Sequence, residues 1–221
     1  MKKAIRVLLI DDHPFSLEGY KLVLNELHSK QKINQYYTDE AYCCETALNY
    51  IKNKSYDLVI LDISLPPSED GLFQSGLDLG RLLTKKNPIT KIIVITSHND
   101  PLLLNNILYT LSPKGFLYRG DINARILSDS IVSILNNNTY FSTLILNLIH
   151  KNLSSNIILD AKDKQILYEL SKGVKTIDLK NVIPLSQAGI EKRKRLLKET
   201  FKTKQLDDTA LIKAAIETGF L

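Results

Sequence analysis

Acidic and hydroxyl side chains follow three apolar runs that have the composition of buried strands. Asp11 and Asp12 come directly after the first run, Asp62 ends a second, and Thr96 ends a third. The carboxyl ends of parallel strands meet at one edge of a sheet, where α/β domains place their sites. We therefore expect these four side chains to converge.

Three converging carboxylates would repel one another unless a cation lay between them. This arrangement predicts a hard cation such as Mg²⁺, which prefers oxygen ligands. An aspartate beside that cation can act as a nucleophile toward a phosphoryl group, and a threonine hydroxyl can bind the phosphoryl oxygens. A single Asp after a strand is common in turns, whereas this combination is much less expected by chance. The pattern therefore indicates a phosphoryl-accepting site.

The elements that must position these residues alternate between strand and helix over the first 135 residues. Apolar runs indicate five strands, at residues 5–10, 33–38, 58–61, 91–96 and 115–118. Helical spacing follows each of them, at residues 15–27, 41–51, 77–83, 102–111 and 122–135. Strands joined through helices lie parallel in one sheet that is covered on both faces. We expect a doubly wound α/β domain with a five-stranded parallel sheet.

Three asparagines at 136–138 mark a domain boundary. We expect the α/β domain over 1–136, a linker with a helix over 137–158, and a small all-α, four-helix domain over 159–221. Its helices are expected between Asp160 and Gly173, over 176–182, from Ser186 to about Phe201, and from Asp207 or Asp208 to Gly219.

Charge and composition narrow the class of protein. The net charge is +5, and residues 172–205 carry ten Lys and Arg against three Asp and Glu. Such a segment favours a polyanionic partner, although a solvated helix face has the same composition. No apolar stretch approaches the roughly 20 residues of a membrane span, and Asp11 and Asp12 interrupt any signal-peptide apolar region. We expect a cytoplasmic protein with no membrane association.

Residues 4–135 resemble the receiver domain of bacterial two-component response regulators. The resemblance rests on LLIDDHP, LVILDISLP, IIVITSH and GFLYRGD, which occur in the family's order and spacing. It implies that Asp62 is the phospho-acceptor. It also implies that Asp12, Asp62 and the backbone carbonyl of Ser64 bind Mg²⁺, and that Asp11 assists through water.

The same resemblance assigns the switch positions of the domain. Thr96 would be the switch hydroxyl and Phe116 the aromatic switch residue. The family has a lysine after the fifth strand, where this chain has Arg119. Arginine can still bind a phosphoryl group through two N–H donors, or it can pair with Asp62 and mimic activation without phosphate. The loop after Asp62 is longer than is usual in the family, which we interpret as a tolerated surface insertion.

Residues 159–221 resemble the four-helix DNA-binding domain of LuxR/NarL-type regulators, through LDAKDKQILYELSKG, LSQAGIEKRKRLLKETF and DDTALIKAAIETGFL. The helix from Ser186 would be the recognition helix. Its apolar spacing predicts an outer face that carries Glu191, Lys192, Arg195 and Lys198. By motif position, bases would be read by Glu191, Lys192 and Arg195. DNA phosphates would be contacted by Ser186, Gln187, Arg193 and Lys194.

Together, the two resemblances imply a transcription regulator that is not an enzyme. A sensor histidine kinase would phosphorylate it, and it would bind double-stranded DNA as a homodimer. Three alternatives stay open: a phosphorylation-independent DNA-binding regulator in which Arg119 fixes the active state, a protein-binding adaptor, and a phosphatase with Asp62 as nucleophile. The phosphatase would lack a general acid, because Ser64 stands two residues after Asp62.

Overall fold

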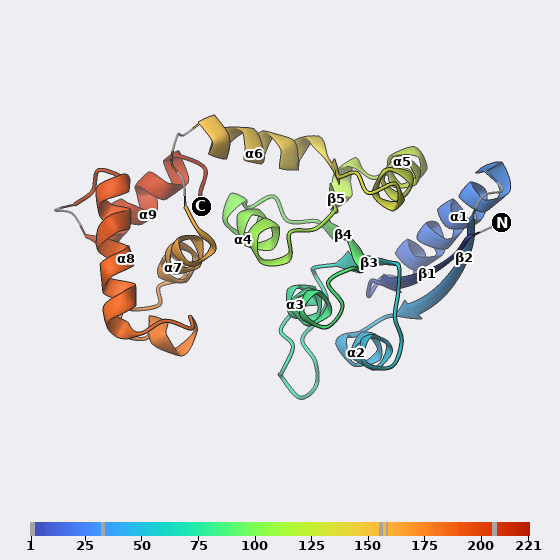
Figure 1. Ribbon diagram of the computed structural model, residues 1–221, viewed down its shortest axis with the longest axis horizontal. Coiled ribbons are helices and arrows are strands. Elements are labelled where there is room, and N and C mark those ends of the chain that lie inside the picture. Colours follow the sequence, from blue (N-terminus) through green and yellow to red (C-terminus); the bar gives the residue numbers. More distant parts are fainter. Residues whose placement is uncertain (1–2, 32–33, 155–156, 158, 205–206) are drawn as a thin grey trace. The chain divides into compact units, whose positions relative to one another are not determined.

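The computed structural model of the protein describes residues 3–31, 34–154, 157, 159–204 and 207–221. Strands and helices alternate in its N-terminal part, and the C-terminal part is helical (Figure 1). The chain divides into two compact units, which are residues 1–97 with 111–145 and residues 98–110 with 146–221.

A parallel sheet forms the centre of the first unit. Its strands are β1 (Lys3–Ile10), β2 (Asn34–Ala41), β3 (Leu58–Asp62), β4 (Lys91–Thr96), β5 (Gly115–Tyr118) and β6 (Tyr140–Phe141). Their order is β2-β1-β3-β4-β5-β6, and all neighbours pair in parallel. The order reverses direction between β1 and β3, so the expected doubly wound α/β fold is confirmed. Sites in such sheets form beyond the carboxyl ends of the strands at this reversal.

Helices cover both faces of this sheet. They are α1 (Pro14–Gln31), α2 (Cys44–Asn53), α3 (Gly76–Lys86) and α5 (Ala124–Leu135), with a short 3₁₀ turn, η1 (Arg119–Asp121). α1 packs beside α5, and α2 beside α3. Ile5, Val7 and Leu9 of β1 join α1 and α5 in one apolar cluster. Leu8 and Ile10 are also fully buried, and alternation along a strand turns them to the opposite face.

Within the described residues, the sheet has six strands rather than the expected five. β6 lies inside the segment 137–158, which was expected to be a linker. The N–H of Ser142 donates to the carbonyl of Phe116 (3.0 Å), and Ser142 Oγ accepts from the N–H of Tyr118 (3.1 Å). These bonds occupy polar groups on the edge of β5 and carry the sheet past residue 136. The helix expected in this segment follows as α6 (Thr143–Ser154).

The second unit is helical. It contains α4 (Pro101–Leu111) up to residue 110, most of α6, α7 (Ala161–Ser171), the 3₁₀ turn η2 (Leu179–Asn181), α8 (Gln187–Thr200) and α9 (Asp208–Glu217). The helix expected over 176–182 is wrong, because only the single turn η2 forms there. Pro184 disfavours helical backbone at Ile183, which opposes continuation of η2 on its C-terminal side.

Capping side chains begin the three α-helices between residue 160 and the C-terminus where the sequence predicts. Asp160 accepts from the backbone of Lys162 and Asp163, and Ser186 Oγ accepts from Gly189. The three helices enclose an apolar core in which the rings of Phe201 and Phe220 meet edge to face at 5.8 Å. No helix in the described ranges combines the length and apolar character that crossing a membrane requires.

Candidate functional site

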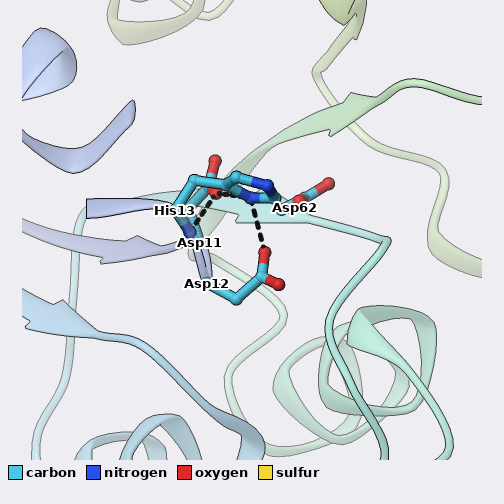
Figure 2. Close-up of side chains that lie close together, drawn as sticks. All are labelled: Asp11, Asp12, His13 and Asp62. Atoms are coloured by element: carbon cyan, nitrogen blue, oxygen red, sulfur yellow. Dashed lines mark hydrogen bonds and ion pairs between the residues drawn. The ribbon is translucent and has the colours of Figure 1, made fainter. Parts of the chain in front are cut away.

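Three aspartates meet at the carboxyl end of the sheet, as the sequence predicts. Asp11 and Asp12 follow β1 directly, and Asp62 is the last residue of β3. Their ligand atoms and one of His13 all lie within 4.8 Å of one another (Figure 2). Asp11 is fully buried and Asp62 is 1% exposed. Burying two carboxylates costs free energy unless charge or hydrogen bonds compensate them.

The donors of this cluster fit a divalent cation. Asp12 Oδ1 and Asp62 Oδ2 are buried and accept no hydrogen bond within the described residues. His13 Nδ1 lies 2.8 Å from Asp12 Oδ1 and 3.3 Å from an oxygen of Asp11. Carboxylate oxygens are the ligands that Mg²⁺ prefers. The acidic cluster can therefore bind a metal.

Arg119 places a positive charge in this cluster. It begins η1, directly after β5, and its Nη2 lies 2.9 Å from Asp11 Oδ2 and 2.7 Å from Asp62 Oδ2. Its Nη1 donates to Ser16 Oγ on α1 (2.9 Å). The hydroxyl of Tyr20, also on α1, donates to the same Asp11 oxygen (2.8 Å). The guanidinium thus bridges two buried carboxylates. Two residues of α1 support this bridge, because Ser16 contacts the guanidinium and Tyr20 contacts Asp11.

Burial and charge shift the pKa values of these groups in different directions. Burial raises the pKa of the Asp62 carboxyl, although the N–H of Ser64 and the charge of Arg119 act against the shift. Burial and the neighbouring charge of Asp11 raise the pKa of Tyr20, which stays a hydrogen-bond donor. Burial lowers the pKa of Arg119, but the charges of Asp62 and Asp11 among others outweigh it and the net shift is upward. Arg119 is therefore the group of this bridge whose charged form the surroundings favour.

The expected switch residues lie on the two strands that follow β3 in the sheet. Thr96 ends β4 and is buried, one residue beyond the position that is level with Asp62. Phe116 in β5 is fully buried between Val94 of β4 and Phe141 of β6 in the sheet register. Ser64 follows Asp62, and its N–H donates to Asp62 Oδ1 (3.1 Å).

A second set of candidate residues lies on α8 in the second unit. Glu191, Lys192 and Arg195 are exposed on one side of this helix, opposite the buried Ile190 and Leu197. Gln187 donates to Glu191 (2.8 Å). Ser186 is the N-cap residue, so its hydroxyl already accepts from the backbone of Gly189. α8 therefore presents a mixed polar face to solvent.

Three other basic residues of α8 pair with acids of the same unit. Arg193 contacts Asp160 and Asp163, each at 2.7 Å. Lys194 and Lys198 contact Asp208 at 2.6 and 3.0 Å. Lys198 was expected on the outer face, and this placement is wrong: the carboxylate at the start of α9 draws its ammonium group inward, where its side chain is 17% exposed.

Sequence reasoning missed three residues of the acidic cluster. Ser16 and Tyr20 are four positions apart on a predicted helix, which places them on one face, but Tyr20 also fits the apolar stripe of that helix. His13 is exposed, yet it contacts both Asp11 and Asp12. Its position directly after the two aspartates was the available signal.

Comparison with protein families matches residues 7–114 to the response regulator receiver domain. The response regulator UvrY of Escherichia coli is 25% identical over 189 residues, which are 82% of this chain and 81% of that protein. The oxygen regulatory protein NreC of Staphylococcus carnosus is 21% identical over 228 residues, covering 92% of this chain and all of that protein.

Solved structures similar in fold extend over both units. A structure of two RcsB dimers bound to two parallel DNAs has a TM-score of 0.60 at 20% identity, covering 97% of this chain and 98% of that one. RcsB of Salmonella enterica serovar Typhimurium bound to promoter rprA, with a phosphomimetic, has a TM-score of 0.57 at 19% identity, with coverage of 96% and 98%. These likenesses support the fold of the whole chain.

Proposed function

We propose that this chain, whose residues 7–114 match the response regulator receiver domain, is a DNA-binding regulator of transcription controlled by phosphorylation. The observation that carries the proposal is the convergence of Asp11, Asp12 and Asp62 at the strand ends of a receiver domain. The exposed polar face of α8 supports the DNA-binding half.

In the proposed reaction, a sensor histidine kinase transfers a phosphoryl group to Asp62. A carboxylate oxygen of Asp62 attacks the phosphorus, a P–O bond forms, and the P–N bond to the kinase histidine breaks. Asp12, Asp62 and the carbonyl of Ser64 would hold Mg²⁺, and Asp11 would act through water. Bound Mg²⁺ would neutralise charge on the incoming phosphoryl group. Ser64 stands two residues after Asp62, where a phosphatase would have its general acid. We therefore infer that the chain accepts a phosphoryl group and does not turn over phosphate esters.

The proposed switch couples this site to the rest of the receiver domain. Thr96 would bind the phosphoryl oxygens, and Phe116 on the neighbouring strand would shift with it. Arg119 would exchange its contact with Asp62 for one with the phosphoryl group, which accepts two N–H donors of a guanidinium. Phosphorylation then biases an equilibrium between two states because it interacts differently with each.

The second unit would bind double-stranded DNA through α8. A helix of this kind fits the major groove, where Lys and Arg contact guanine and Glu accepts from cytosine. We assign base contacts to Glu191, Lys192 and Arg195. Ser186 and Gln187 at the start of the helix would contact phosphates, and Arg193, Lys194 and Lys198 would do so only by leaving their acidic partners. The solved RcsB structures with dimers on DNA support a homodimer here.

The receiver half is tested by the intact mass of the purified protein after incubation with acetyl phosphate and Mg²⁺. We expect wild type to gain one phosphoryl group and Asp62→Asn to gain none, because the amide is not a nucleophile. Asp129→Asn on α5 is the matched control, since this exposed residue lies 3.8 Å from Arg125, one helical turn earlier. This variant should be phosphorylated like wild type. Absence of the gain in wild type would contradict the phosphorylation half.

One observation favours a second candidate function. Arg119 already contacts Asp62 at 2.7 Å. Its positive charge therefore occupies, without phosphorylation, the position to which a phosphoryl group on Asp62 would attract it. A regulator held in its active state by this pair would bind DNA equally well with and without phosphorylation. The protein-binding adaptor stays as a third candidate, and a steep fall of DNA affinity with salt concentration would argue against it.

A further inference from the structure

Two residues of α1 form hydrogen bonds with Arg119 and with its partner Asp11. Ser16 Oγ accepts from Arg119 Nη1 (2.9 Å), and the Tyr20 hydroxyl donates to Asp11 Oδ2 (2.8 Å). Asp11 Oδ2 in turn accepts from Arg119 Nη2 (2.9 Å). Ser16 and Tyr20 are four residues apart, so one face of α1 presents both groups to the acidic cluster.

This arrangement uses the hydrogen-bonding capacity of Asp11 on both oxygens. Oδ1 accepts from the N–H of His13 (3.0 Å), while Oδ2 accepts from Tyr20 and Arg119. Asp62 differs, because its buried Oδ2 accepts no hydrogen bond within the described residues, although Arg119 lies 2.7 Å away. Asp11 is therefore the anchor of the guanidinium, and Asp62 Oδ2 is the oxygen that a metal and the guanidinium would share.

We propose that Ser16 and Tyr20 are positioning residues that hold Arg119 against Asp62 and thereby weaken the binding of a divalent cation to the acidic cluster. The proposal rests on the proposed metal-assisted phosphorylation of Asp62. A cation bound to Asp62 Oδ2 must displace a guanidinium that is held at three points: Ser16, Asp11 and Asp62. Tyr20 acts indirectly, because its hydroxyl fixes the Asp11 oxygen that Arg119 contacts. Each point that is removed makes the displacement easier, so the affinity for the cation rises.

The experiment measures Mn²⁺ affinity of the full chain by the electron paramagnetic resonance signal of free Mn²⁺, with no phosphoryl donor present. Mn²⁺ takes the same oxygen ligands as Mg²⁺. We expect Ser16→Ala to tighten Mn²⁺ binding by about threefold to tenfold, the effect of removing one charge-assisted hydrogen bond from a competitor. Ser16→Thr keeps the hydroxyl and should restore the wild-type affinity.

A double-mutant cycle separates positioning from a general structural effect. Ser16 acts only through the guanidinium in this proposal, so Ser16→Ala should leave Mn²⁺ affinity unchanged when Arg119→Ala is already present. An equal change in both backgrounds would overturn the proposal, and so would an unchanged affinity in the single variant. Failure of Mn²⁺ to bind any of these variants, Arg119→Ala included, would also overturn it.

Tyr56→Phe, in the same unit, is the matched control for Tyr20→Phe. Tyr56 is similarly buried, and its hydroxyl donates to Asp39 at 2.8 Å. Tyr20→Phe should tighten Mn²⁺ binding, whereas Tyr56→Phe removes an equivalent hydrogen bond and should leave it unchanged. Weaker Mn²⁺ binding by Tyr20→Phe would contradict the proposal.

The mass measurement on Asp62 is independent of these affinities. If wild type is phosphorylated but Ser16→Ala and Arg119→Ala show no coupling in their effects on Mn²⁺ affinity, this proposal is contradicted and the proposed function stands. If the two variants are coupled in their effects on Mn²⁺ affinity but wild type is not phosphorylated, the phosphorylation half of the proposed function is contradicted. The positioning of Arg119 by Ser16 then stands.

Discussion

Replacing Gly76 with alanine destabilises the receiver domain by about 1–3 kcal/mol, the usual cost of inserting atoms into packed structure. A Cβ at this position would lie 2.0 Å from the carbonyl oxygen of Asp62 and 3.1 Å from Cα of Ile63. Both are backbone atoms, and the N–H of Gly76 also donates to the carbonyl of Ile63 (3.1 Å). The strain can be relieved only by moving the start of α3 or the end of β3, which carries Asp62.

Urea unfolding followed by circular dichroism measures this loss. Gly19→Ala on α1 is the matched control, because a Cβ there has no atom within 4 Å. That change should stabilise the protein by up to about 1 kcal/mol, since alanine is the better helix former. Equal unfolding midpoints for the two variants would show that α3 does not approach β3 as closely as described.

Replacing Arg195 with alanine weakens the binding of double-stranded DNA by about 10- to 100-fold, as expected for loss of one base contact. Arg195 is exposed on α8, and no acid among the described residues forms an ion pair with it. Its guanidinium is therefore available to DNA without first breaking an ion pair. The affinity is measured by fluorescence anisotropy on a duplex that wild type selects from a random pool.

Two variants make this result specific to the outer face of α8. Lys213→Ala removes the same charge from an exposed position on α9 and should change affinity by less than about threefold, the effect of general electrostatics. Arg193→Ala breaks the contacts with Asp160 and Asp163, so it should lower stability more than DNA affinity. A loss of affinity with Lys213→Ala as large as with Arg195→Ala would contradict the assignment of α8.

The acidic cluster could be predicted because the positions of its residues follow from where the strands end. Asp12, Asp62 and Thr96 each stand at or just beyond the end of an apolar run, and a parallel sheet brings such ends to one edge. The contacts of Arg119 could not be derived in this way. They depend on how far a long side chain reaches across the edge, and the sequence left both phosphate binding and pairing with Asp62 open.

Short elements and long-range ion pairs were the parts that the sequence did not determine. β6 has two residues, which is too short for an alternating pattern. Its position depends on hydrogen bonds that Ser142 donates to Phe116 and accepts from Tyr118 of β5. Lys198 follows the outer-face spacing of α8, but Asp208 in the next helix pairs with it. Helical periodicity predicts the direction in which a side chain leaves the helix. It does not predict an ion pair with a residue ten positions further along the chain.

The central claim is that phosphorylation of Asp62 controls DNA binding by the second unit. The most direct test measures the affinity of wild type for its selected duplex before and after treatment with acetyl phosphate and Mg²⁺, beside Asp62→Asn. We predict that the phosphoryl group tightens binding by about 5- to 150-fold in wild type, the usual range of coupling between two sites, and changes nothing in Asp62→Asn. Equal affinities for the phosphorylated and untreated wild type, with the phosphoryl group verified by mass, would contradict the claim.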